Sequence, residues 1–212
     1  MRKLLLSVFA LLLAGSLVAE VQIPALELPA PQKSGGLPLL DALARRATSR
    51  SFAPTELSRQ QLSDLLWAAF GINRPDGRRT APSARNWQEI DLYVLLQSGA
   101  YVYDAKAHRL NPVVGADLRE FGGTQAFVKD APLTLVFVAN LARMVGGDSA
   151  RQREWAHIDV GYISQNVYLF CTSAGLATGA RAYVDKDTLG AKLNLKPDQL
   201  IVLAQSVGLP KP

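Results

Sequence analysis

Hydrophobic and polar positions along this chain repeat with helical spacing in some stretches and with strand spacing in others. In residues 39–47, Leu40 and Leu43 fall on one face of a predicted helix. A second helical pattern begins after Ser58, a good N-cap residue, and stops at Gly71. The longest helical pattern covers residues 155–174. Three helices are therefore expected, the last of them long enough to cross a whole domain.

Apolar runs between these helices predict strands. The run at residues 133–140 is almost continuously apolar, which is typical of a strand buried on both faces. A polar turn at residues 98–100 suggests a hairpin between two shorter runs. The predicted strands are residues 90–97, 101–103, 133–140 and 200–207. Because helices and strands are interleaved, we expect an α/β or α+β domain built in layers.

The N-terminal segment has the pattern of an export signal. Arg2 and Lys3 precede an uncharged apolar run, and small residues follow it. This predicts a cleavable signal peptide at residues 1–19 and a periplasmic or secreted protein. The rival interpretation is an uncleaved anchor, but the run is shorter than the roughly 20 residues that span a bilayer. An extended, proline-rich segment is expected at residues 20–38 and one domain at residues 39–212.

Charge, cysteine and histidine content exclude several classes of function. The net charge of +5 falls to +3 without Arg2 and Lys3, and the remaining basic residues are scattered among acids, so nothing indicates a nucleic-acid partner. Cys171 is the one cysteine, which precludes an internal disulfide and is interpreted as a core residue. His108 and His157 are the two histidines, and without clustered acids they predict no metal site.

A cluster of guanidinium and hydroxyl groups follows the first predicted helix. Arg46, Thr48 and Arg50 lie within five residues, and arginine side chains can bind phosphate oxygens in pairs. By themselves they could equally be a solvated group at a helix end. A second candidate, PSARN at residues 82–86, precedes a strand and could present an amide to a flat heterocycle, although an ordinary turn would have the same sequence.

Taken together, these segments resemble the nitroreductase family. The Arg46–Arg50 cluster is similar to the Arg-x-Ser/Thr-x-Lys/Arg element of that family, and residues 82–86 are similar to its Pro-Ser-x-x-Asn turn. Residues 101–104, 108–110, 159–166 and 175–178 resemble the SagB-like branch in order and spacing. The sequence contains no counterpart of the Lys-Tyr pair associated with azoline oxidation in that branch, so that activity is not expected.

The resemblance implies a fold, a cofactor and a set of contacts. The fold is a three-layer sandwich with a mixed, mainly antiparallel sheet between helices, assembled as an intertwined homodimer that holds FMN at the interface. Arg46 and Thr48 would contact the phosphate and ribityl end, Arg50 and Asn86 the pyrimidine edge, and residues 179–181 would offer a backbone amide to flavin N5. Lys211 would be the late basic residue that serves the phosphate. The cofactor-binding residues implied in this way are Arg46, Ala47, Thr48, Arg50, Pro82, Ser83, Asn86, Gly179, Ala180, Arg181 and Lys211.

The implied activity is oxidoreductase chemistry on small conjugated acceptors, such as nitroaromatics or quinones, by hydride transfer through flavin N5. No side chain is expected to act as a nucleophile. NAD(P)H is a possible donor, but an exported enzyme would need another one, such as a redox protein or a membrane quinol. Two alternatives stay open: a flavin carrier or sensor without turnover, and a structural dimer without flavin. Trp87, beside the Asn86 turn, could line the flavin pocket or simply belong to the core.

Overall fold

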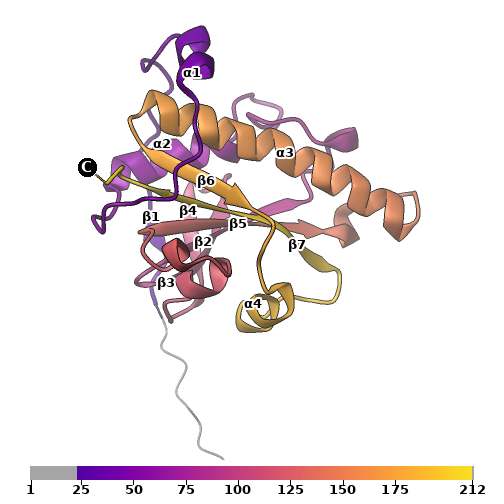
Figure 1. Ribbon diagram of the computed structural model, residues 1–212. Coiled ribbons are helices and arrows are strands. Elements are labelled where there is room, and N and C mark those ends of the chain that lie inside the picture. The colour runs from indigo at the N-terminus through magenta and orange to yellow at the C-terminus, as the bar shows by residue number, and fades with distance from the viewer. Residues whose placement is uncertain (1–22, 212) are drawn as a thin grey trace, which may run out of the picture.

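A computed structural model of the chain describes residues 23–211 and shows a seven-stranded sheet between two layers of helices (Figure 1). The strand order is β1-β4-β3-β2-β5-β7-β6, and every neighbouring pair is antiparallel. The strands are β1 (Leu26–Glu27), β2 (Ile90–Leu96), β3 (Gly99–Asp104), β4 (Arg109–Val114), β5 (Leu133–Asn140), β6 (Ala177–Arg181) and β7 (Gln199–Gly208). The helices are α1 (Leu39–Arg45), α2 (Arg59–Phe70), α3 (Ser149–Ser173) and α4 (Lys186–Lys192).

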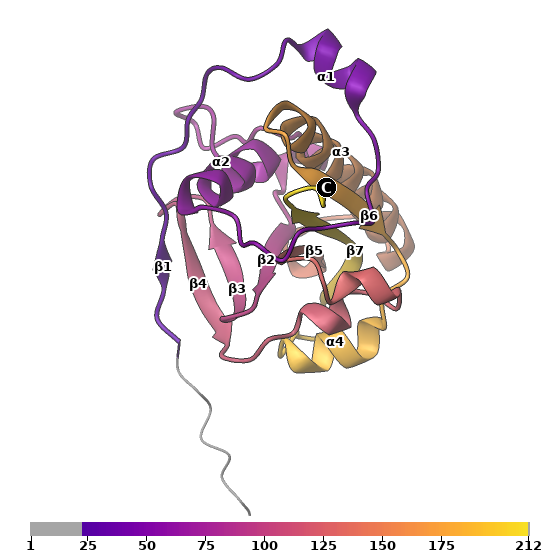
Figure 2. The same cartoon turned by 60° about the vertical axis from the view of Figure 1, so that its left-hand side comes forward.

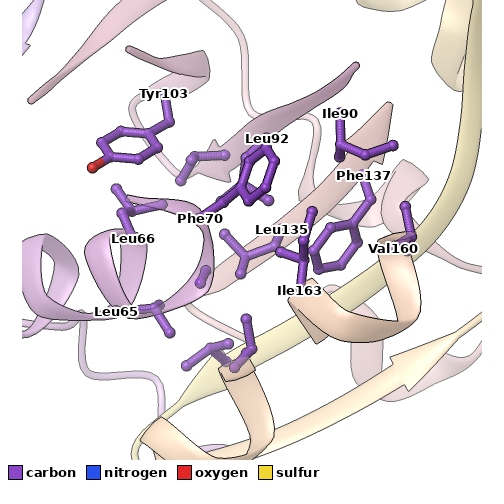
Figure 3. Packing of buried hydrophobic residues seen from close by; sticks show 14 of the residues in the cluster. Leu65, Leu66, Phe70, Ile90, Leu92, Tyr103, Leu135, Phe137, Val160 and Ile163 are labelled. Atoms are coloured by element: carbon purple, nitrogen blue, oxygen red, sulfur yellow. The ribbon is translucent and has the colours of Figure 1, made fainter. Parts of the chain in front are cut away.

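The larger hydrophobic core lies between the sheet and the layer that contains α2 and α3. Leu65 and Phe70 of α2 and Ile163 of α3 pack against inward residues of β2 and β5, such as Phe137 (Figure 3). On the other face, Leu189 of α4 packs with a second set of sheet residues. Strand β5 is buried on both faces because it lies in the middle of both cores, as its apolar run predicts. The layered α+β fold expected from the sequence is thus confirmed.

Local sequence signals explain where the two long helices begin. The Ser58 side chain accepts from Gln61 N, and the Gln61 side chain accepts from Ser58 N, which is a complete capping box at the start of α2. Asp148 caps α3 by accepting from Arg151 N, so this helix starts six residues earlier than its apolar pattern indicates. Cys171 is fully buried in α3, and burial raises the pKa of its thiol.

Four elements were not anticipated from the sequence: β1, β4, β6 and α4. Strand β4 contains Pro112, which weakens a strand pattern, and β6 is only five residues long with a glycine at its centre. Residues 23–38, the described part of the proline-rich segment before α1, contain β1, which pairs with β4. The predicted signal peptide at residues 1–19 lies outside the described residues. Within residues 23–211, no helix combines the length and apolar character needed to cross a membrane.

Helix α1 differs from its expected packing. Its predicted apolar face is exposed: Leu39, Leu40 and Leu43 have exposed fractions of 64%, 77% and 46%, and only Ala42 is buried. Figure 2 shows α1 standing off from the body between two extended segments. On α3, Ile158 and Tyr162 are likewise about half exposed. The face traced by these two residues in the sequence pattern therefore does not point into the core of the single chain.

Candidate functional site

The arginine cluster runs in extended form beside the edge strand β6. Helix α1 ends at Arg45, and Ser49 N then donates to Thr178 O of β6 over 2.8 Å. Gly179 permits this approach, because a Cβ there would lie 2.6 Å from Ser49 O. Segments 46–50 and 179–181, more than 120 residues apart in sequence, are thus neighbours in the fold.

The hydroxyl group of Tyr168 joins these two segments. It accepts from Ala180 N over 2.9 Å and shares a hydrogen bond with Thr48 Oγ1 over 3.1 Å. The ring of the same tyrosine lies under the Arg46 guanidinium, 5.3 Å from its Cζ. Tyr168 therefore contacts Arg46 and Thr48, which are predicted to bind the phosphate and ribityl end of FMN. It also contacts Ala180, in the segment predicted to face flavin N5.

Both arginines of the cluster are available to an anion. Within residues 23–211, neither Arg46 nor Arg50 forms an ion pair with a carboxylate. Arg50 and Thr48 are exposed, and Arg46 is half-buried. Guanidinium groups without acidic partners attract an anion such as a phosphate monoester.

Arg181 belongs to the segment that is predicted to offer a backbone amide to flavin N5. Its side chain is buried and donates to the carbonyl groups of Gly122 and Gly179 and to the hydroxyl groups of Thr134 and Ser206. Burial lowers the pKa of this guanidinium to about 10, a value at which it still carries a positive charge at neutral pH. The Arg181 side chain therefore has a structural role in the interior, and only the backbone of Arg181 is available along β6.

Lys211 lies at the end of the chain that returns to the cluster. Phe52 pairs with Pro210 in an isolated antiparallel bridge, and Ala53 N donates to Leu209 O over 2.9 Å. This brings the exposed Lys211 next to the segment that directly follows Arg50. The structure thus places the late basic residue in the same region as the arginine cluster, as the resemblance implies.

The second predicted segment, residues 82–86, forms a strained and exposed turn. Arg85, Asn86 and Gln88 have φ values of 49°, 56° and 50°, a left-handed conformation that non-glycine residues rarely adopt. Ser83 Oγ accepts from Gln88 N, and Asn86 Oδ1 accepts from Gln88 Nε2. Strain of this kind is concentrated at functional sites. Pro82 and Asn86 are exposed, and the side-chain nitrogen Nδ2 of Asn86 has no hydrogen-bond partner within residues 23–211.

Within one chain, this turn and the arginine cluster lie at different parts of α3. Ala84 N donates to Asp159 Oδ2 over 2.8 Å, whereas the cluster contacts Tyr168. The nine residues between Asp159 and Tyr168 correspond to about 13 Å along the helix axis. In a single copy, the two groups of predicted flavin ligands therefore contact separate stretches of α3.

Three side chains at the turn form an aromatic and cationic cluster. The rings of Trp87 and Trp155 are 5.2 Å apart, and the Arg85 guanidinium lies 5.4 Å and 5.8 Å from their centres. These contacts attach the turn to the first part of α3. Both tryptophans are half-buried, so they form part of a wall rather than part of the central core.

Sequence reasoning missed Tyr168, although the structure places it at the centre of the arginine cluster. The available signal was weak: Tyr168 follows the Gln165-Asn166 pair of the family-like segment, in a helix where aromatic residues usually serve packing. Its role depends on Thr48 and Ala180, which come from two other elements. Only the tertiary structure could bring these groups together.

Comparison with known proteins is consistent with this geometry. The family model described as "Nitroreductase family" matches residues 43–209. A Methanocaldococcus jannaschii protein, provisionally described as a nitroreductase, is 31% identical over 169 residues, which are 75% of this chain and 81% of that protein. A crystal structure from Ralstonia eutropha, with the same provisional description, is 39% identical with a TM-score of 0.85, covering 89% of this chain and 90% of the other.

A more distant structure shares the fold alone. NADPH:FMN oxidoreductase from Vibrio harveyi, complexed with NAD+, is 19% identical with a TM-score of 0.63, covering 82% of this chain and 69% of the other. The match over residues 43–209 includes α2, α3 and all strands except β1, together with both groups of predicted ligands. This chain belongs to the nitroreductase family, a family of flavin-dependent oxidoreductases.

Proposed function

We propose that this protein is an FMN-dependent oxidoreductase that transfers two electrons as hydride to small conjugated acceptors such as nitroaromatics or quinones. The observation that carries the proposal is the unpaired arginine cluster held against β6 by Ser49 and Tyr168. A flavin phosphate needs cationic donors, and its ring needs backbone and amide groups in fixed positions. The chain supplies the cationic donors at residues 46–50. It supplies the backbone and amide groups at β6 and at the Asn86 turn.

The residues present fit FMN in charge. Arg46 and Thr48 would bind the phosphate and the ribityl chain, with Lys211 nearby. Arg50 would place a fixed positive charge near the pyrimidine edge, where it stabilises a reduced, anionic ring. Bound FMN supplies the hydride chemistry itself at N5. The protein would orient the flavin ring and hold these positive charges in place.

The site requires a second copy of the chain. The Asn86 turn is separated from the arginine cluster within one chain. Leu39, Leu40 and Leu43 of α1 and Ile158 and Tyr162 of α3 are exposed apolar side chains, and we take them together as the apolar face of α1 and α3. Exposed apolar surface of this kind is typical of an interface. In a homodimer, the turn of one copy would approach the cluster of the other and complete the pyrimidine end of the site.

Export and the electron donor belong to the same proposal. If residues 1–19 act as a signal peptide, the enzyme works outside the cytoplasm, where NAD(P)H is not supplied. A redox protein or a membrane quinol would then reduce the flavin in place of NAD(P)H. Membership of the SagB-like branch also remains part of the proposal, supported by the order of the motifs in residues 101–178.

The visible absorption spectrum of the purified protein tests the cofactor directly. After addition of excess FMN and desalting, the protein should keep the absorption bands of oxidised flavin. Reduction with dithionite followed by a quinone should then give faster reoxidation than that of free FMN. Reoxidation at the rate of free FMN would favour the carrier or sensor, and a protein that never retains FMN would contradict the proposal.

Arg46 is the most direct single test of the phosphate position. Replacement by alanine should weaken FMN binding by about tenfold or more, because a charge-assisted contact is lost. Thermal stability should change little, since Arg46 is not a core residue. Arg45→Ala is the matched control: it removes a neighbouring exposed guanidinium at the last position of α1. Equal FMN affinity in the two variants, measured by fluorescence titration, would show that the phosphate lies elsewhere.

A further inference from the structure

Glu89 lies directly behind the Asn86 turn and is fully buried. Its exposed fraction is 0%, and neither Oε atom has a hydrogen-bond partner within residues 23–211. An ionised carboxylate without partners is one of the least favourable groups to bury. Glu89 occupies the position immediately before Ile90, the first residue of β2, so it connects the turn to the sheet.

A second unsatisfied acceptor lies beside Glu89 at this end of the sheet. Asn140 lies opposite Glu89 at the end of the β2–β5 ladder, where Asn140 N donates to Glu89 O over 2.9 Å. The side-chain oxygen of Asn140 is also buried without a partner. The unsatisfied side-chain atoms of Glu89 and Asn140 are thus all acceptors. A proton on the Glu89 carboxyl group would add a hydrogen-bond donor and remove the buried charge in one step.

The neighbouring acid is Asp159 of α3, with an exposed fraction of 3%, whose Oδ2 accepts from Ala84 N of the turn. Burial raises the pKa of Glu89 to about 7. The charge of Asp159 acts in the same direction, and the Glu89 backbone acts against it. Arg143 also lowers it, but this guanidinium is bound to Asp91 and to Gln88 O.

We propose that Glu89 is a positioning residue that stays protonated and donates a hydrogen bond to the Asp159 carboxylate. This hydrogen bond keeps Asp159 in contact with Ala84 N, and that contact holds the Asn86 turn in its strained shape. The inference for flavin binding rests on the proposed function; the inference for the turn does not. Three left-handed residues, Arg85, Asn86 and Gln88, need such a support, because each is unfavourable by itself.

Loss of the Glu89 proton would place two carboxylates side by side in a site that water does not reach. Their repulsion would move Asp159 away from Ala84 N, which is the contact between the turn and α3. The turn would then loosen, and Asn86 would lose its position. The affinity for FMN should therefore fall as pH rises through neutrality.

Glu89→Gln tests this proposal, because glutamine has the size of the protonated acid and retains donors for Asp159. We expect FMN to bind the wild-type protein about tenfold more weakly at about pH 8.5 than at about pH 6, equivalent to a one-unit difference in the pKa of Glu89 between bound and free protein. Glu89→Gln should show less than about a twofold change. Glu154→Gln, which neutralises an exposed acid on α3, should behave like the wild type.

The near-ultraviolet circular dichroism of the protein without flavin gives a second readout, because Trp87 and Trp155 pack against the turn. The wild-type signal should titrate between the same pH values, and the Glu89→Gln signal should not. Should Glu89→Gln fail to fold, Asp159→Asn serves instead: it keeps an acceptor for Ala84 N, removes the charge, and should move the titration to lower pH.

The outcomes separate the two inferences. A Glu89→Gln variant that titrates like the wild type in circular dichroism overturns the positioning role. A wild-type dichroism titration that Glu89→Gln abolishes, in a protein that binds no FMN at any pH, supports the positioning role and overturns the flavin site.

Discussion

At the scale of single residues, Tyr168 is the contact that unites the site. Its hydroxyl group binds Ala180 N and Thr48 Oγ1, and its ring supports Arg46. A hydrogen bond of this type contributes about 0.5–1.5 kcal/mol, and a partner left unsatisfied costs somewhat more. The position of the arginine cluster against β6 therefore depends on this oxygen atom together with the Ser49 N–Thr178 O hydrogen bond.

Tyr168→Phe removes that oxygen atom and keeps the ring. We expect about tenfold weaker FMN binding, because Thr48 and Ala180 N are no longer joined, while the cation contact of Arg46 with the ring persists. Fluorescence titration measures the affinity. Tyr183→Phe is the control, since Tyr183 is 76% exposed. An affinity equal to that of the control would mean that the tyrosine hydroxyl does not hold the site together.

At the scale of elements, the site depends on how closely the segment after α1 approaches β6. Gly179→Ala would place a Cβ 2.6 Å from Ser49 O, so the two backbones must separate. We expect a loss of about 1–3 kcal/mol in the free energy of unfolding, together with weaker FMN binding. Denaturant unfolding measures the first quantity.

Gly190→Ala is the control for this substitution. Its Cβ would meet nothing closer than Leu195 Cδ1 at 3.9 Å, and alanine favours the helix α4. Unchanged or increased stability is therefore expected for Gly190→Ala. Equal stability of the Gly179→Ala protein would show that segment 46–50 does not pack as closely on β6 as described.

The extended arm before α1 is held by His108. Ser63 Oγ donates to Pro29 O, so it must accept from His108 Nε2, and Tyr103 then donates to His108 Nδ1. This network needs a neutral imidazole. Burial lowers the pKa of His108, with smaller effects from the Pro29 backbone, Lys33 and Asp64.

The stabilisation from this neutral histidine should depend on pH. The pKa in the folded state is below that in the unfolded state, so the contribution is complete above about pH 6.5 and is lost as pH falls through the folded value. We expect amide protection of residues 26–32 to decrease on acidification, as measured by hydrogen exchange corrected for intrinsic rates. His108→Gln should abolish the pH dependence, and the exposed His157→Gln should preserve it. Persistence of the dependence in His108→Gln would assign it to another group.

At the scale of the whole molecule, the exposed apolar face of α1 and α3 is the feature that the single chain leaves unexplained. Leu40 is 77% exposed on a helix that makes little contact with its own domain. Burial of such a side chain contributes about 1.5–3 kcal/mol, so burial of several of them in an interface would stabilise a dimer substantially.

Leu40→Glu should therefore shift the proposed homodimer to monomers in light-scattering measurements after size-exclusion chromatography. The affinity for FMN should fall when the dimer dissociates, because the Asn86 turn of the second copy is lost. Val145→Glu adds the same charge at a residue that is 74% exposed, outside this face, and should leave the dimer intact. A wild-type protein that is monomeric at all concentrations and still binds FMN would contradict the two-copy site.

Much of the fold and part of the site could be predicted from local pattern. The run at residues 133–140 is observed as β5 with the predicted bounds, and the helices before Gly71 and after Asp148 follow from apolar spacing and caps. The short strands β4 and β6 could not be predicted, because a strand with a proline or a central glycine has little local preference of its own. Such strands form because their neighbours supply hydrogen bonds.

The sequence by itself determined the layered fold, the family-like motifs and the residue types of the candidate site, because periodicity, capping and side-chain chemistry are local properties. Only the tertiary structure shows which groups meet: Tyr168 with Thr48 and Ala180, and Asp159 with Ala84 N of the Asn86 turn. These contacts join residues from separate elements. They depend on how the sheet and α3 pack together, and no stretch of sequence contains that information.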